Sequence, residues 1–223
     1  MKKTVLPVLL ATLMGSSVAH GAMITNGDFA DCTLNGWSTD SDLTAGSSSE
    51  ITVENDGGTC YAQITIDNTE AFANILYQEL DLTAASGSEV WLDLSFAVNS
   101  ELTDQDPGTA DYFSVYLNDG MGNFYDNTLA FGGMYDFVDI NGEATYTQSF
   151  LLDESIYNES GWFLEFQLNS NFDVSPSSFQ LFSAALREEV SDVSAPGTFP
   201  LMLLSAAGII AMRQRKNKGG DHA

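Results

Sequence analysis

Carboxylates supply most of the reactive groups in this 223-residue chain, which has 31 Asp and Glu against 7 Lys and Arg. Between Ala22 and Ala195 the sequence contains neither His nor Lys. This segment therefore cannot form a Ser-His-Asp triad, a Cys-His pair, a Schiff-base lysine or a histidine-ligated zinc site. Carboxylate chemistry remains, above all glycoside hydrolysis by two acids. No short run places spaced Glu and Asp on one side of a strand, so we predict a non-catalytic protein. A carboxylate-dependent glycoside hydrolase is the alternative.

Aromatic side chains offer a second chemistry, because the apolar faces of sugars stack on exposed rings. In the run DYFSVYLN, Tyr112 and Tyr116 point to the same side of a predicted strand, roughly 13 Å apart. Trp91 and Phe163 join them if their strands are neighbours. We predict that these four residues form a carbohydrate-binding platform. The alternative is that this face is covered and the rings belong to the core.

Two groups of aspartates have the oxygen ligands that calcium prefers. One group is Asp28 and Asp31, and the other is Asp104, Asp106 and Asp111. The second group does not have the spacing of an EF-hand loop. Calcium is thus a candidate cofactor, and ordinary solvated acidic loops are the favoured interpretation.

The N-terminus has the pattern of a secretory signal peptide. Lys2 and Lys3 precede the apolar run TVLPVLLATLM and the small residues GSSVAHGA, which predicts cleavage after Gly21. The chain that follows is expected to lie outside the cytoplasm, where disulfides form. We therefore predict a disulfide between Cys32 and Cys60, the only cysteines, with two buried thiols as the alternative.

Near the C-terminus, the residues from Val193 to Met212 carry no charge. A helix of about 20 residues spans about 30 Å, the thickness of a bilayer's hydrocarbon core. Four basic residues follow directly and are expected to stay on the cytoplasmic side: Arg213, Arg215, Lys216 and Lys218. The segment is either a membrane anchor or a tail that is removed.

The predicted exterior segment is strongly acidic. Every acidic residue except Asp221 lies in it, and Arg187 is its only basic residue. Such a surface repels phosphate backbones, which excludes nucleic acid as a partner. It is equally typical of a protein from a salty habitat or of one that attracts cations.

Apolar residues in this segment alternate with period two, which predicts strands. The run VWLDLSFAV puts Leu92, Leu94, Phe96 and Val98 on one face. Further strands are expected at 61–66, 75–82, 112–117, 146–152, 162–168 and 179–186, with turn-rich runs between them. We predict an all-β fold, an antiparallel β-sandwich, over residues 22–186. A signal peptide (1–21), a linker (187–197) and an apolar C-terminal helix with its basic stub (198–223) complete the chain.

The C-terminal stretch resembles the PEP-CTERM sorting signal, a short proline motif followed by an apolar helix and a basic cluster. Ala195, Pro196 and Gly197 stand where that family has Pro-Glu-Pro, and Arg213, Arg215 and Lys216 match the cluster. The resemblance implies a membrane-embedded exosortase as processing partner. It also implies export to the envelope or the surface, or secretion after the tail is cut.

The run ITNGDFADCTLNGWSTD resembles the opening of galactose-binding-like jelly rolls, which include many carbohydrate-binding modules. The resemblance implies that Phe29 and Trp37 are core anchors and that Asn26 and Gly27 make a tight turn. It also implies a structural calcium near this strand, although the last strand, SFQLFSAAL, lacks the expected acidic pair.

These observations predict a jelly-roll protein that binds or organises extracellular polysaccharide without cleaving it. A purely structural role in the envelope or matrix is a further alternative.

Overall fold

A computed structural model describes residues 23–41, 50–66, 72–100, 111–137, 142–170 and 176–190. The predicted signal peptide, the sorting motif and the C-terminal segment 198–223 lie outside these residues, and so do Asp104 and Asp106. Of the two compact units of the chain, the first ends at Glu189. Only Val190 of the second unit is among the described residues. Within the described ranges, no helix is long and apolar enough to cross a membrane.

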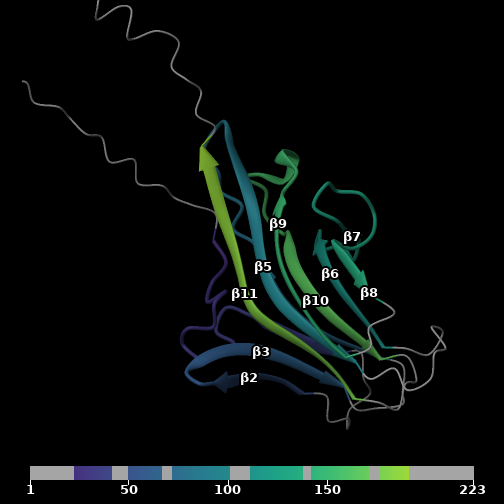
Figure 1. The fold of residues 1–223 in the computed structure, drawn as a ribbon. Helices are drawn as coiled ribbons and strands as arrows, with labels where there is room; N and C mark the ends of the chain where they lie inside the picture. Colours follow the sequence, from purple (N-terminus) through teal and green to yellow (C-terminus); the bar gives the residue numbers. More distant parts are fainter. Residues whose placement is uncertain are drawn as a thin grey trace, which may run out of the picture. The chain divides into compact units, whose positions relative to one another are not determined.

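The described residues form strands and one short 3₁₀ helix (Figure 1). The strands and the helix η1 are β1 (Ser38–Ser41), β2 (Glu50–Asp56), β3 (Thr59–Ile66), β4 (Phe72–Glu79), β5 (Ser88–Ser100), β6 (Tyr112–Asn118), β7 (Phe124–Tyr125), β8 (Tyr135–Phe137), β9 (Gly142–Leu151), η1 (Glu154–Ile156), β10 (Phe163–Ser170) and β11 (Ser177–Val190).

Two antiparallel sheets pack face to face. The six-stranded sheet has the order β1-β4-β10-β6-β7, with β8 also paired to β6. The five-stranded sheet has the order β2-β3-β11-β5-β9, and its long strands β5 and β11 run side by side in Figure 1. Strands that are far apart in the sequence therefore lie next to each other, as β4 and β10 do. The predicted all-β, antiparallel jelly-roll sandwich is confirmed.

The core lies between the two sheets and follows the predicted alternation. Leu92, Leu94 and Phe96 of β5 are buried, whereas the residues between them are partly exposed. Phe179 of β11 stacks on Phe96 at 5.1 Å between ring centroids and meets Phe166 of β10 at 5.4 Å. Aromatic contacts thus join the two sheets through the middle of the sandwich.

The opening turn is anchored as the resemblance implies. Phe29 is fully buried and stacks on Trp37 at 5.7 Å between ring centroids. The Phe29 amide donates to the Asn26 carbonyl, which closes the turn. The predicted disulfide is present, since Cys32 of this turn is bonded to Cys60 of β3.

Gly27 is expected to be required for this packing. A Cβ at this position would lie 1.9 Å from the carbonyl oxygen of Ala184 on β11. That oxygen belongs to the backbone, and the Ala184 amide in turn donates to the Gly27 carbonyl at 2.8 Å. We predict that Gly27→Ala destabilises the domain by about 1–3 kcal/mol, the usual cost of overpacking. Urea unfolding measures this, and an unchanged midpoint would show that the turn moves freely away from β11.

The predicted boundary at residue 186 is too early. Strand β11 continues to Val190, so the predicted linker begins inside it. The charges of the REE run do not end the strand, because Arg187 and Glu188 are partly exposed and Glu189 is exposed, so their charged groups reach solvent from within it. Arg187 there forms ion pairs with Asp93 of the neighbouring β5 and with Glu189.

Candidate functional site

On the outer face of the six-stranded sheet, aromatic and polar side chains lie next to one another on neighbouring strands. In one row, Glu165 of β10 lies between Tyr77 of β4 and Tyr116 of β6. In the next row, Phe163 lies beside Asn118, which is paired in turn with Phe124 of β7. Neighbouring strands are about 4.8 Å apart, so the two tyrosines lie roughly 10 Å apart on either side of Glu165.

The rings of this face are held in pairs. Tyr77 meets Phe163 edge to face at 6.0 Å between centroids, and Tyr116 lies 4.8 Å from Phe124. The backbone of Gly133 supports Tyr116, because a Cβ there would lie 3.0 Å from the tyrosine ring. The aromatic side chains are therefore fixed in place, as a stacking surface requires.

Hydrogen bonds link the polar side chains along β10. The Asn118 amide donates to Glu165 Oε2 at 2.9 Å, and the Gln167 amide donates to Glu165 Oε1. The Asn169 amide lies 3.5 Å from Gln167 Oε1 and continues the series. We call Asn118, Glu165, Gln167 and Asn169 the polar row. Glu165 is only 6% exposed, so these hydrogen bonds hold a carboxylate at the base of the face.

A hollow of about 380 Å³ opens over one end of the polar row. It is lined by three aromatic residues, two carboxylates and smaller groups: Tyr77, Phe124, Phe163, Asp40, Glu165, Ile75, Asn118, Gly120 and Gly122. Such a mixture of rings and hydrogen-bonding groups is typical of a small-molecule or glycan site.

Three of the four predicted platform residues share this face. Tyr112, Tyr116 and Phe163 are partly exposed on the neighbouring strands β6 and β10. The apolar residues that alternate with them, Phe113, Val115, Leu117 and Leu164, are buried in the core. Burial raises the pKa of the Tyr116 hydroxyl, although a hydrogen bond with Ser114 acts to lower it. Tyr112 and Tyr116 thus lie on the same face of β6.

Trp91 does not join them. It lies on β5 of the five-stranded sheet, and the neighbours of β5 are β11 and β9. The Arg187 guanidinium lies over the Trp91 ring, 5.6 Å from its centroid. Arg187 also bonds Asp93 at 3.0 Å. Burial acts to raise the pKa of Asp93, but hydrogen bonds from Arg187 and Ser149 lower it overall. Trp91 therefore belongs to a structural cluster on the opposite face.

The sequence analysis missed several residues of the hollow. Tyr77 and Glu165 are the central ones, and Asp40, Asn118 and Phe124 complete it. The alternation in the runs ILYQEL and FLEFQLN places Tyr77 and Glu165 on the strand face opposite to that of the buried leucines next to them. The pairing of β4 with β10, which brings these two side chains together, is not visible in a local pattern.

Two of the aspartates predicted as calcium ligands, Asp28 and Asp31, accept hydrogen bonds from their own loop. Asp31 Oδ1 accepts hydrogen bonds from Asn26 Nδ2 at 2.8 Å and from Thr33 Oγ1 at 2.7 Å. Asp28 Oδ1 accepts from the Ala30 amide at 3.2 Å. Asp111, directly before β6, is buried. Among the described residues, no three His, Cys, Asp or Glu side chains are grouped closely enough to hold a metal ion.

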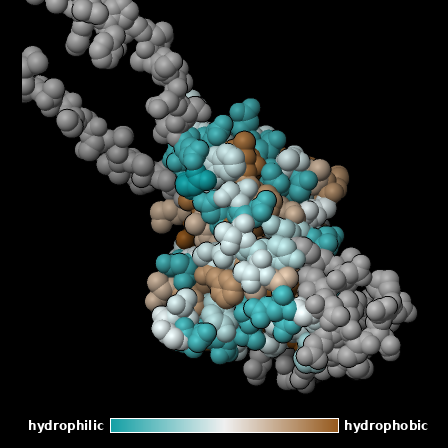
Figure 2. Space-filling view, in the orientation of Figure 1, coloured by the Kyte–Doolittle hydropathy of each residue, from teal (hydrophilic) through white to brown (hydrophobic). Residues whose placement is uncertain are grey.

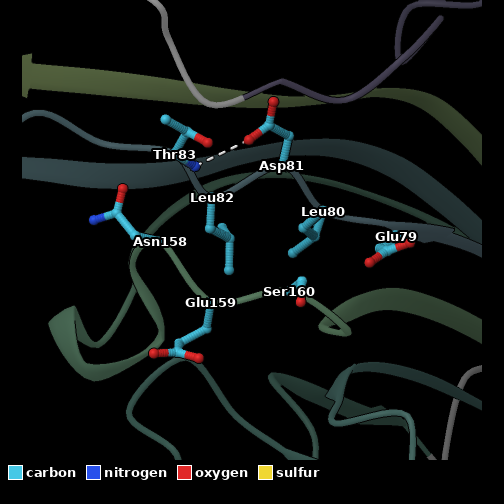
Figure 3. A pocket seen from close by; sticks show the side chains of 8 residues that line it. All are labelled: Glu79, Leu80, Asp81, Leu82, Thr83, Asn158, Glu159 and Ser160. Carbon is cyan, nitrogen blue, oxygen red and sulfur yellow. Dashed lines mark hydrogen bonds between the residues drawn. The ribbon is translucent and has the colours of Figure 1, made fainter.

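A second hollow, of about 370 Å³, lies between the segment after β4 and the segment before β10 (Figure 3). Its acids are Glu79, Asp81 and Glu159, and it has no aromatic lining. In Figure 3 these three carboxylates point in different directions, and Asp81 accepts a hydrogen bond from the Thr83 amide at 3.0 Å. This hollow offers neither a stacking surface nor a ligand cluster.

Figure 2, in the orientation of Figure 1, shows hydrophilic residues across much of the visible surface, with hydrophobic ones scattered over it. The exposed rings and the polar row described above lie together on the six-stranded sheet.

An acidic turn directly follows β7, the strand that carries Phe124. Asp126 Oδ1 accepts from the amides of Thr128 at 2.8 Å and Ala130 at 3.1 Å. Burial acts to raise the pKa of Asp126, but the hydrogen bonds from Thr128 and Ala130 lower it overall. A carboxyl whose pKa is lower in the folded state contributes stability above its unfolded pKa of about 3.9, and that contribution is lost as the pH falls.

Asp126→Asn is therefore expected to lower the melting temperature more at pH 6 than at pH 3. At pH 6 the variant lacks a charge-assisted hydrogen bond, whereas at pH 3, below the unfolded pKa, part of that stabilisation is already lost in the native protein. Because the site is partly solvated, we expect a loss below about 1 kcal/mol. Calorimetry at the two pH values measures this, and a difference that grows at pH 3 would contradict the assignment.

Comparison with known proteins gives similarity in solved structures only. No protein-family model matches the sequence, and no curated protein matches it. One similar structure is TmCBM61 in complex with β-1,4-galactotriose, with 16% identity and a TM-score of 0.43, covering 74% of this chain and 97% of that one. Another is the Caldicellulosiruptor saccharolyticus CBM27-1 in complex with mannohexaose, with 13% identity and a TM-score of 0.41, covering 74% and 94%.

A third similar structure is the enzymatically active domain of tailspike protein 4 from bacteriophage CBA120. It has 13% identity and a TM-score of 0.45, and the alignment covers 74% of this chain. This chain spans only 21% of the length of the tailspike domain.

Proposed function

We propose that this protein binds polysaccharide, without cleaving it, on the outer face of the six-stranded sheet. The observation that carries the proposal is the hollow in which Tyr77, Phe163 and Phe124 surround the end of the polar row. Rings accept the apolar faces of sugars, and amides and carboxylates bond the hydroxyls. Both kinds of group stand side by side here, each fixed by its neighbours.

The polar row is arranged for positioning rather than for proton transfer. Glu165 accepts hydrogen bonds from Asn118 and Gln167, so its two oxygens are oriented by amides. A second carboxylate, Asp40, lines the same hollow from the edge strand β1. The hydrolase alternative would assign these two acids to catalysis, and the assay below separates the two functions.

The protein is proposed to act outside the cytoplasm. The disulfide between Cys32 and Cys60 supports this location, because such bonds persist in oxidising compartments. The signal-peptide pattern at residues 1–21 points the same way. We place the protein at the cell envelope or in the extracellular matrix.

The tail is proposed to deliver the protein there. The apolar segment from residue 198 stops translocation, and the cluster with Arg213, Arg215 and Lys216 fixes its orientation. An exosortase-like enzyme then cuts near Ala195 to Thr198. Mass spectrometry of the surface-exposed protein tests this, since peptides from Met202 to Met212 in the mature form would show an uncut membrane anchor.

A glycan array with the exported protein, from residue 22 onward, tests the proposed binding. We expect retention on one or more glycans and no release of reducing sugar from any glycan that is bound. Release of reducing sugar would favour the hydrolase, and no retention on any glycan would favour a purely structural role. A parallel array with a calcium chelator tests whether glycan binding requires a calcium ion, for which Asp28 and Asp31 are the candidate ligands.

A further inference from the structure

We infer that the hollow prefers glycans with free amino groups, an inference that rests on the proposed function. Its two carboxylates, Asp40 and Glu165, stand among aromatic rings. Asp136, in the same face, accepts a hydrogen bond from Ser114 at 3.1 Å. A ligand in the hollow therefore meets negative charge from more than one strand.

No basic side chain within the described ranges balances this charge. Arg187 is the single Lys or Arg there, and it lies on the five-stranded sheet over Trp91. It is already paired with Asp93 and Glu189. The carboxylates of the hollow are thus partnered by neutral groups only.

Glu165 is the strongest indication. It is 6% exposed, and its hydrogen-bond donors are the neutral amides of Asn118 and Gln167. Burial of a carboxylate costs free energy that an opposite charge nearby offsets most effectively. An ammonium group in the hollow would supply that charge on binding.

The rings favour the same ligand. A cation is attracted to the faces of aromatic rings, and Tyr77, Phe163 and Phe124 all line the hollow. A uronate or sulfated sugar would instead meet like charge on entry. A neutral sugar can still bond Glu165 through a hydroxyl, so it should bind more weakly than its amino counterpart.

Calorimetric titration of the exported chain with two short oligosaccharides tests the preference. The ligands are a glucosamine trimer with free amines and the fully N-acetylated trimer of the same length. Short ligands are needed because a long polycation would bind any chain as acidic as this one, which has 31 Asp and Glu against 7 Lys and Arg in its full sequence. We expect the free-amine trimer to bind about 10-fold more tightly at low salt, and less so at high salt.

Two variants with the same change in net charge locate the effect. Glu165→Gln is expected to bring the affinity ratio of the two trimers close to one. Glu54→Gln, on the exposed side of β2 in the five-stranded sheet, is the matched control and should keep the ratio. Melting temperatures establish that both variants are folded. Tyr77→Phe, which keeps the ring and the charge, should also keep the ratio.

The outcomes separate this inference from the proposed function. Equal affinities in the wild type, or an equal loss of preference in Glu165→Gln and Glu54→Gln, would overturn the inference. If neither trimer binds, the inference fails as well, and the glycan array decides whether the proposed function stands. Binding of neutral glycans without amine preference removes only the inference.

Discussion

Replacing both Tyr77 and Phe163 with Ala should lower glycan affinity by about 100-fold. The two rings meet edge to face at 6.0 Å between centroids and line the same hollow. Truncation of an aromatic contact residue at a binding site commonly costs about 1–2 kcal/mol or more, so two together cost about 3 kcal/mol. Both side chains lie on the outer face, partly exposed, so the melting temperature should change little. Titration calorimetry and thermal unfolding measure the two effects.

Trp91→Ala provides the control for this variant. Trp91 is also a partly exposed aromatic residue, but it lies on the other sheet beneath Arg187. We expect glycan affinity to be kept in this variant. Loss of affinity in Trp91→Ala, together with retention in the Tyr77 and Phe163 variant, would place binding on the five-stranded sheet instead.

Removing the disulfide should produce the second large effect. Cys32 and Cys60 are 28 residues apart, and their bond ties the opening turn to β3. On the chain-entropy model, closing a loop of this size stabilises the folded state by about 3–4 kcal/mol. In a domain of this size the loss corresponds to a melting temperature roughly 6–16 °C lower. Thermal unfolding of the Cys32→Ala, Cys60→Ala double variant measures it.

Thiol labelling of the denatured wild type is the companion measurement. Without reductant, no thiol should react, since the described chain has no free cysteine. Labelling of two thiols per chain would show that the exported protein does not contain the bond. An unchanged melting temperature in the double variant would show that the bond forms but contributes little to stability.

Local alternation was sufficient to predict which side chains point inward. Phe113, Val115 and Leu117 are fully buried, as the run DYFSVYLN predicts, because a strand alternates its side chains between two faces. The same reasoning placed Tyr112 and Tyr116 together on the outside. The opening motif likewise indicated that Phe29 and Trp37 belong to the core.

The pairing of strands could not be predicted in this way. Trp91 and Phe163 have similar local patterns, yet β5 and β10 belong to different sheets. Tyr77 and Glu165 meet because β4 pairs with β10 over the whole length of both strands. Such contacts depend on the global topology, and the alternation within a strand carries no information about its neighbours.

The end of the domain was missed for a related reason. A run of charges usually indicates a solvated linker, but Arg187 pairs with Asp93 of β5 and packs over Trp91. These contacts keep β11 extended as far as Val190. They are made with a strand almost a hundred residues earlier in the chain, so the run REEV alone does not reveal them.

Mapping a bound glycan by NMR tests the central claim most directly. A glycan retained on the array is added to the isotope-labelled protein, and the residues whose backbone signals shift are assigned. The account predicts shifts at Tyr77, Phe163 and Glu165 and along the rest of the polar row, with none at Trp91 or Arg187. Shifts confined to the five-stranded sheet would contradict it, because they would leave the rings and the polar row of β10 without a part in binding.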